Sequence, residues 1–252
     1  MLHQKCDSIS LTQIIFLKKM KNIIIASTST LHGGDYLEYL LPELSVHFEN
    51  CKTILFIPFA RPSGISYQDY TLKVGLAFAK INKEVEGIHE FDDFSKAIKN
   101  AEGIFTGGGN TFLLVSQLYK NNIMTLLADT IKNGTPYLGT SAGSNICGLT
   151  MQTTNDMPII YPPSFQTLGL IPFNLNPHYL DPDVQSKHMG ETRENRINEF
   201  HSLNSSPVLG LREGSWLEVK GDEITLKGNL TARLFRQNQT PTEIESGSDF
   251  SY

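Results

Sequence analysis

Apolar residues in the first half of the chain fall into short runs separated by amphipathic stretches. Runs rich in β-branched and aromatic residues predict buried strands at 21–27, 53–58, 87–91, 103–106 and 136–139. The stretches between them predict helices at 36–40, 70–81, 94–98, 111–119 and 124–131. Strands that alternate with helices are typical of an α/β fold, with a mostly parallel sheet covered by helices on both faces.

The last third of the chain has a different pattern. Short apolar runs predict strands at 208–211, 216–219 and 223–226, and Gly221 and Asp222 lie between the last two, so an antiparallel hairpin is expected near the C-terminus. We expect residues 20–252 to form a single α/β domain. Residues 1–19 carry no motif and precede the first strand, so we expect a disordered N-terminal extension.

Composition narrows the class of protein. The 252 residues include 21 Lys and Arg against 26 Asp and Glu, a net charge of −5 that does not favour nucleic acid as a partner. Cys6, Cys51 and Cys147 are odd in number and form no C-x-x-C pair, which argues against a disulfide framework or a zinc site and favours a cytoplasmic protein. No apolar run approaches ~18 residues, so no membrane partner is expected.

The segment Gly139–Gly143 has the pattern G-x-S-x-G between a predicted strand and a predicted helix. This is the context of a nucleophile elbow, in which small neighbours allow a sharp turn that exposes the hydroxyl of Ser141. The alternative is a turn rich in glycine and serine that only links the strand to the helix.

A second glycine-rich segment, Gly107–Gly109, follows another predicted strand and precedes Asn110. Glycines let a backbone approach a ligand with its N–H groups turned inward. One amide of this segment and the amide of Ala142 could therefore form an oxyanion hole. Phosphate binding at the following helix is one alternative, and a tight turn with Asn110 as helix cap is another.

A serine nucleophile needs a base and an orienting carboxylate. Of seven histidines, only His178 lies in a segment built like a site, with two asparagines and a proline before it. Asp156, in a polar run soon after the elbow, and Glu213, between two apolar strands, are both candidates for the acid. A simple ion pair with Arg212 would also explain Glu213.

These motifs together resemble the peptidase E family of aspartyl dipeptidases, from Met20 to about residue 230. Several separate blocks match in order, which is far more specific than any one of them. The matching blocks are 29–31, 56–60, 107–112, 141–143, 153–158, 176–178 and 190–193. The family's fold is related to class I glutamine amidotransferases, with a serine where those enzymes carry cysteine. Residues 1–19 have no counterpart, and the stretch between Tyr179 and Gly190 diverges.

The resemblance implies a serine-type dipeptidase that cleaves Asp-X peptides through an acyl-enzyme, without metal or cofactor. It implies Ser141 as nucleophile, His178 as base and Glu213 as acid, with Asp156 the alternative acid and Gly109 and Ala142 the oxyanion donors. The implied partner is a small peptide, and the chain is expected to be a monomer or homodimer. Alternatives are a cyanophycinase-like hydrolase, an esterase, or a non-catalytic protein that binds anions.

Arg193 is our candidate for binding the aspartate side chain, with Asn110 as a second substrate-binding residue. In the helix predicted after Gly190, Arg193 shares a face with Ile197 and Phe200, so it is expected to point inward. A cation in the first turn of a helix opposes the helix dipole, which makes a merely structural role less favourable. The alternative is an ion pair of Arg193 with a neighbouring glutamate, Glu191 or Glu194.

Overall fold

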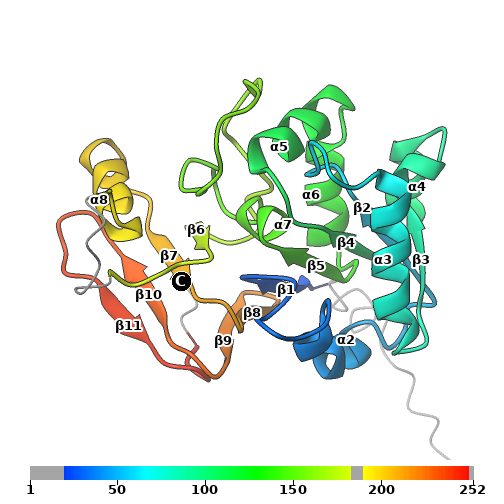
Figure 1. Ribbon diagram of the computed structural model, residues 1–252, viewed down its shortest axis with the longest axis horizontal. Helices are drawn as coiled ribbons and strands as arrows, with labels where there is room; N and C mark the ends of the chain where they lie inside the picture. Colours follow the sequence, from blue (N-terminus) through cyan, green and yellow to red (C-terminus); the bar gives the residue numbers. More distant parts are fainter. Residues whose placement is uncertain (1–19, 183–189, 250–252) are drawn as a thin grey trace, which may run out of the picture.

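The computed structural model describes residues 20–182 and 190–249, so the predicted extension at 1–19 lies outside the described residues. The described strands form two sheets (Figure 1). The larger has the order β3-β2-β4-β5-β1-β8-β9 and consists of β1 (Asn22–Ala26), β2 (Thr53–Ile57), β3 (Glu84–Gly87), β4 (Gly103–Thr106), β5 (Tyr137–Thr140), β8 (Ser215–Lys220) and β9 (Glu223–Gly228). Strands β1 to β5 are parallel, and β8 and β9 extend the sheet as an antiparallel hairpin.

Helices cover both faces of this sheet, and its central strands are therefore buried at nearly every position. On β1, Ile23 and Ile25 belong to one buried cluster, and Ile24 and Ala26 belong to the other, as strand alternation requires. The first cluster is completed by α4, α5 and α6 and the second by α2 and α3. The described helices are η1 (Glu38–Leu40), α2 (Leu41–His47), α3 (Tyr67–Ala79), η2 (Ile88–Glu90), α4 (Phe94–Asn100), α5 (Thr111–Lys120), α6 (Met124–Lys132), α7 (Ala142–Asn145) and α8 (Arg193–Leu203).

The predicted α/β class is confirmed, and the predicted bounds of two elements are wrong. The strand expected at 87–91 is β3, which ends at Gly87, and 88–90 forms the short helix η2. This edge strand pairs only with β2, and its alternating glutamates hid it from a search for apolar runs. The helix expected to end near Pro42 is instead followed directly by α2. Pro42 lies in the first turn of α2, where a backbone N–H has no partner inside the helix, so the N–H that proline lacks is not needed there.

The smaller sheet has the order β11-β10-β7-β6 and lies with α8 at the end of the molecule opposite α3 and α4 (Figure 1). Its strands are β6 (Asn174–Pro177), β7 (Val208–Leu211), β10 (Ala232–Phe235) and β11 (Thr242–Ile244). Helix α8 packs on this sheet through Ile197, in a small cluster with Tyr179, Val208 and Phe235. The chain crosses from the smaller to the larger sheet between β7 and β8.

The carboxyl ends of the parallel strands meet at one edge of the larger sheet. Ser27 follows β1, the glycine loop follows β4, and Ser141 follows β5. In open α/β sheets this edge is where ligands bind. The fold therefore brings the two glycine-rich motifs to the same place.

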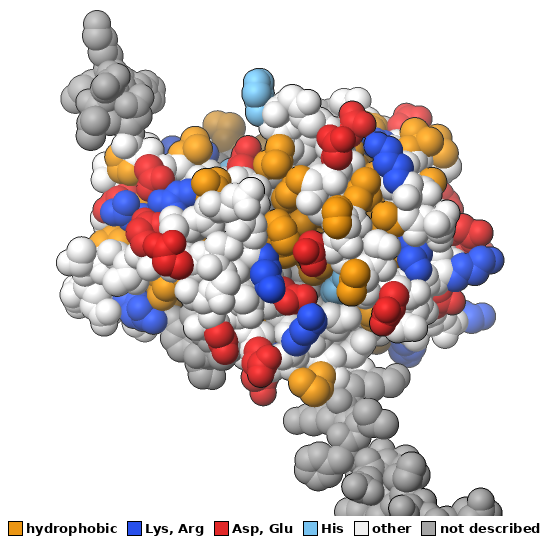
Figure 2. All heavy atoms as spheres, turned by 90° about the horizontal axis from the view of Figure 1, so that it is seen from below, with side chains coloured by type: hydrophobic (Ala, Val, Ile, Leu, Met, Phe, Trp, Pro, Cys, Tyr) orange, Lys and Arg blue, Asp and Glu red, His pale blue; other side chains and the backbone are white. Residues whose placement is uncertain are grey.

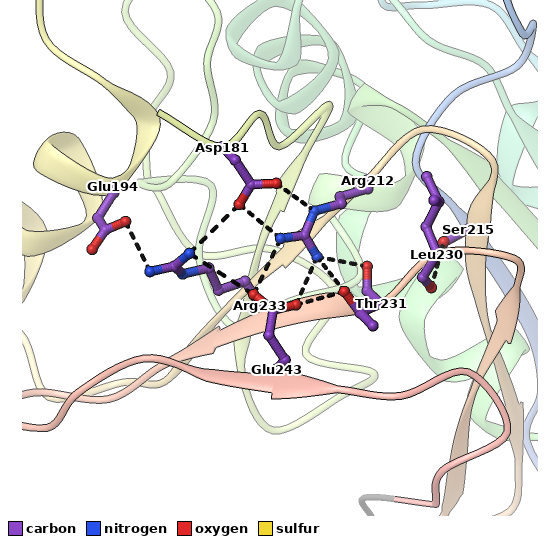
Figure 3. Close-up of polar contacts among 8 residues, drawn as sticks. All are labelled: Asp181, Glu194, Arg212, Ser215, Leu230, Thr231, Arg233 and Glu243. Carbon is purple, nitrogen blue, oxygen red and sulfur yellow. Dashed lines mark hydrogen bonds and ion pairs between the residues drawn. The ribbon is translucent and has the colours of Figure 1, made fainter. Parts of the chain in front are cut away.

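Charged side chains join the smaller sheet to α8 and to the segment after β6; we call Asp181, Glu194, Arg212, Arg233 and Glu243 the charge cluster (Figure 3). Arg212 donates to Asp181 at 2.7 Å and to Glu243 at 2.8 Å. Arg233 lies 3.2 Å from Glu194. The Arg212 side chain is only 15% exposed, so these contacts fix the chain where β7 ends.

Away from this cluster, the surface carries no dominant charge on the face that Figure 2 shows. Acidic and basic side chains are interspersed there among small hydrophobic patches. No helix in the described ranges is long and apolar enough to cross a membrane. A charged ligand would therefore be recognised by individual side chains rather than by the overall electrostatic field of that face.

Replacing Arg212 should lower stability in a pH-dependent way. Its hydrogen bonds lower the pKa of Asp181 and of Glu243. Carboxylates with a lowered folded pKa stabilise the protein above their unfolded pKa values of about 4, and this stabilisation is lost as the pH falls through the folded values. We expect Arg212→Met to lower the melting temperature by about 5 °C at pH 7, since charged hydrogen bonds contribute ~1.5–3 kcal/mol.

The difference between wild type and Arg212→Met should shrink when melting is measured below about pH 4. Arg196→Met is the matched control, because Arg196 is 51% exposed and pairs with Glu191 at 3.6 Å. Such surface pairs contribute ~0–1 kcal/mol. Equal melting temperatures for the two variants at pH 7 would contradict the stabilising role of the cluster.

Candidate active site

Ser141 occupies a strained turn between β5 and α7. Its backbone angles are φ 55° and ψ −110°, the unusual conformation that a nucleophile elbow imposes. A Cβ on Gly139 would collide with the carbonyl group of Gly143, and a Cβ on Gly143 would collide with the backbone of Thr106. Both glycines of the G-x-S-x-G pattern are thus required by close backbone packing. The interpretation as an elbow fits this geometry better than a simple linking turn.

The structure brings Ser141, His178 and Glu213 into one hydrogen-bonded row. His178 Nε2 lies 2.8 Å from Ser141 Oγ, and His178 Nδ1 lies 2.5 Å from Glu213 Oε1. The three residues come from the end of β5, the end of β6 and the connection between β7 and β8. A histidine held between a hydroxyl and a carboxylate is the arrangement that activates a serine for nucleophilic attack.

Glu213 is available to His178 because its neighbour Arg212 is engaged elsewhere. Arg212 turns into the charge cluster, where Asp181 and Glu243 accept its hydrogen bonds (Figure 3). The simple ion pair between Arg212 and Glu213 is therefore not formed.

Asp156, the other candidate acid, makes no hydrogen bond to His178. Its Oδ2 accepts from the Thr111 amide and the Thr111 hydroxyl, both at 2.7 Å, and from the Thr154 hydroxyl at 3.1 Å. These bonds hold the loop of Asp156 against the first turn of α5. Asp156 nevertheless shares a small hollow with Ser141 and His178. The lining residues are Thr111, Ser141, Ala142, Asn145, Thr154, Asn155, Asp156, Pro177 and His178.

Two asparagines, Asn155 and Asn176, place this loop beside His178. Asn176 donates to the carbonyl of Thr153 at 2.8 Å. Asn155 donates to the carbonyl of Pro177 at 2.7 Å, directly before His178. The polar residues that singled out the His178 segment in the sequence therefore tie β6 to the loop that carries Asp156.

The glycine loop lies directly beside the elbow. A Cβ on Gly108 would lie 3.0 Å from the Cβ of Ser141. The Gly108 amide donates to the hydroxyl of Tyr70 at 3.1 Å, which fixes the loop against α3. Gly109 has φ 147°, and a Cβ there would collide with the backbone of Ala60.

Two backbone amides beside Ser141 are suited to stabilise negative charge. Within 20–182 and 190–249, neither the Gly109 nor the Ala142 amide has a hydrogen-bond acceptor. Ala142 is the first residue of α7, where an amide has no partner inside the helix. Both amides remain available for an oxyanion that forms next to Ser141.

Asn110 already uses both ends of its side-chain amide. Its oxygen accepts from the Leu113 amide at 3.0 Å, which caps α5, and its nitrogen donates to the Met157 carbonyl at 2.8 Å. Its backbone amide donates to Ala60 at 2.7 Å. These contacts give Asn110 a structural position at the rim of the site, as the helix-cap interpretation expected.

Arg193 is the first residue of α8, and the Thr192 side chain caps the helix by accepting from the Asn195 amide at 3.1 Å. Ile197 is buried on the same face, and Phe200 packs against the same cluster. Ile197 and Phe200 therefore face the core as predicted.

Neither glutamate beside Arg193 forms an ion pair with it. Glu194 pairs with Arg233 at 3.2 Å, and Glu191 pairs with Arg196 at 3.6 Å. The part of the chain that the structure describes contains no carboxylate within 4.0 Å of the Arg193 guanidinium.

The electrostatic surroundings of Arg193 point toward the hollow. Burial lowers the pKa of Arg193, Arg196 lowers it further, and the charge of Asp156 raises it. Asp156 lines the hollow with Ser141, whereas Arg193 is not among the residues that line it.

Two residues of the site escaped the sequence analysis: Tyr70, which holds the glycine loop, and Ser27, which binds the backbone of His178 at 2.9 Å. A usable signal existed for Ser27, a polar residue directly after a buried strand on the edge that carries the motifs. Tyr70 lies within a predicted helix and had no such signal.

No other described feature competes for the chemistry. No group of three or more His, Cys, Asp or Glu side chains is gathered to hold a metal among the residues described. A larger cavity of about 530 Å³ lies at the opposite edge of the sheet, beside Thr53 and Glu102, and contains neither the serine nor the histidine.

Comparison with known proteins gives consistent results. The profile of peptidase family S51 matches residues 23–227. "Peptidase E" of Streptomyces coelicolor is 46% identical over 230 residues, covering 91% of this chain and 93% of that protein. "Probable alpha-aspartyl dipeptidase" of Drosophila melanogaster is 41% identical over 235 residues, covering 92% and 97%. The crystal structure of a peptidase from an acI-B1 Actinobacterium is similar in fold, with a TM-score of 0.69 at 15% identity over 93% of this chain and 98% of that one.

Proposed function

The chain belongs to peptidase family S51, and we propose that it is a serine-type dipeptidase that hydrolyses Asp-X peptides through an acyl-enzyme. One observation carries the proposal: His178 lies in hydrogen-bond contact with both Ser141 Oγ and Glu213. Relatives named for peptidase E and for aspartyl dipeptidase activity support the substrate class.

In the proposed first half-reaction, His178 Nε2 takes the proton of the Ser141 hydroxyl as its oxygen attacks the main-chain carbonyl carbon of the first residue. Glu213 stabilises the imidazolium that forms, and the amides of Gly109 and Ala142 bind the oxyanion. His178 then gives its proton to the leaving amine, so that the C–N bond breaks and an aspartyl ester of Ser141 remains.

In the second half-reaction, water replaces the leaving amine. His178 removes a proton from this water as it attacks the ester carbonyl. The same two amides stabilise the second oxyanion, and Ser141 recovers its proton when the ester breaks. The His178 side chain is 36% exposed, so water can reach the imidazole.

The opposite charges of Asp156 and Arg193 suit an N-terminal aspartate. Such a residue carries an α-ammonium group and a side-chain carboxylate. We assign the ammonium to Asp156, whose Oδ1 has no protein donor in the described ranges, and the carboxylate to the guanidinium of Arg193. Asn110 then contributes by fixing the loop rather than by touching the substrate.

The alternatives draw less support from the site. An esterase would share the Ser141 row but would not require the charges at Asp156 and Arg193. A non-catalytic protein that binds anions would require neither His178 nor Glu213 beside Ser141. A cyanophycinase-like enzyme would share the arrangement around the nucleophile. An assay with an aspartate–arginine polymer distinguishes such an enzyme from a dipeptidase.

Release of aspartate from Asp-Leu is the direct test of the function. The purified chain should release free aspartate, with Asn-Leu, an acyl ester and an aspartate–arginine polymer as comparison substrates. Ser141→Ala should keep the wild-type melting temperature and lose turnover by orders of magnitude. Turnover by Ser141→Ala within about threefold of wild type would overturn the assignment of the nucleophile.

Glu213→Gln and Asp156→Asn should fail in different ways. Glutamine can hold the wrong imidazole tautomer, so Glu213→Gln should lower kcat by up to about 10⁴-fold. Asp156→Asn should mainly raise KM, because asparagine has no charge for the ammonium. Steady-state kinetics on equally folded samples measure both effects, and a larger kcat loss in Asp156→Asn would reverse the assignment of the acid.

Arg193→Met should reduce discrimination for aspartate. We expect kcat/KM for Asp-Leu to fall at least about a hundredfold, because the variant leaves the substrate carboxylate without its charged hydrogen-bond donor. The gap between Asp-Leu and Asn-Leu should narrow in the same variant. Arg196→Met, one turn further along α8 and paired with Glu191, is the matched control and should keep the wild-type preference.

A further inference from the structure

We propose that Ser27 is a positioning residue that holds His178 and the Glu213 segment in register with Ser141. The inference rests on the proposed function, because it concerns how the same catalytic row is assembled. Ser27 is 0% exposed, so it acts through other residues and not on the substrate.

The Ser27 hydroxyl joins the two sheets at the site. It accepts a hydrogen bond from the His178 amide at 2.9 Å and donates one to the Leu211 carbonyl at 2.7 Å. Its own amide donates to the Ser215 carbonyl at 3.1 Å. Leu211 and Ser215 flank the connection that carries Glu213. The Ser27 side chain thus binds His178 and one end of this segment, and the Ser27 backbone amide binds the other end.

This contact matters because the nucleophile and the base stand on different sheets. Ser141 belongs to the larger sheet, and its amide donates to Ala26, the residue before Ser27, at 3.2 Å. His178 follows β6 of the smaller sheet. Ser27 is therefore a direct link between the backbone that carries His178 and the strand that holds Ser141.

The backbone of His178 needs such a link. His178 has φ 56°, a left-handed conformation that is unfavourable for a residue with a side chain. The hydrogen bond from its amide to Ser27 stabilises this conformation and so fixes the direction of the imidazole. A displacement of about 1 Å at such a site can cost on the order of 10²-fold in rate.

Ser27→Ala removes both hydroxyl contacts and tests the proposal. We expect kcat for Asp-Leu to fall about a hundredfold, with KM within about threefold of wild type, because the substrate-binding groups are untouched. Ser215→Ala is the matched control: Ser215 is equally buried, and among the described residues its hydroxyl donates only to the Leu230 carbonyl, at 3.1 Å (Figure 3). This control should keep kcat within about threefold at a temperature well below melting.

Ser27→Cys serves if the alanine variant does not fold. Cysteine nearly preserves the volume, but a thiol is a weak donor and acceptor, so kcat should still fall at least about tenfold. A kcat for the folded Ser27 variant within threefold of wild type, or an equal loss in Ser215→Ala, would overturn the proposal. If the wild-type protein did not hydrolyse Asp-Leu, or if Ser141→Ala still did, the proposed function would instead be overturned.

Discussion

The site depends on the carboxyl end of β1, where the two sheets meet. The Ala26 carbonyl accepts from the Ser141 amide at 3.2 Å and from the Ser144 hydroxyl at 2.6 Å, which fixes the elbow to the larger sheet. The next residue, Ser27, binds the His178 amide and the Leu211 carbonyl. Ala26, the last residue of β1, and Ser27, directly after it, thus tie down Ser141, His178 and the segment that carries Glu213. These three residues come from different elements, and the elements share one anchor.

Selective pairing of charges decides which polar groups remain for chemistry. Arg212 and Arg233 are bound within the charge cluster (Figure 3). Glu213 therefore keeps its contact with His178. The glutamates on either side of Arg193 are paired with other arginines. The exposed pair of Glu191 and Arg196 adds little stability. The larger effect of these pairings is to keep carboxylates away from the guanidinium that we assign to the substrate.

Much of the site could be predicted from the sequence because its motifs are local. The elbow and the glycine loop are short segments whose conformation depends on their own glycines, and parallel strands bring them to one edge. The acid could not be chosen in this way, because Asp156 and Glu213 both lie in polar turns and only tertiary packing tells them apart. The smaller sheet was only partly predicted, since β6 reads Asn-Leu-Asn-Pro and carries no apolar run. Ser27 was missed because its role lies in contacts 151 and 184 residues away.

The charges of Asp156 and Arg193 account for selection of the substrate's amino end as well as of its aspartate. On the proposed function, Asp156 binds an α-ammonium and Arg193 a side-chain carboxylate, so the hollow is matched to a residue that carries both charges. An aspartate inside a longer peptide keeps the carboxylate but lacks the ammonium, and would leave Asp156 without its cation. An N-terminal asparagine keeps the ammonium and leaves the Arg193 guanidinium without an anion. Because a partly buried charge without a partner is costly, each mismatch is rejected independently. On this assignment, restriction to the amino end and preference for aspartate both follow from the opposite charges of Asp156 and Arg193.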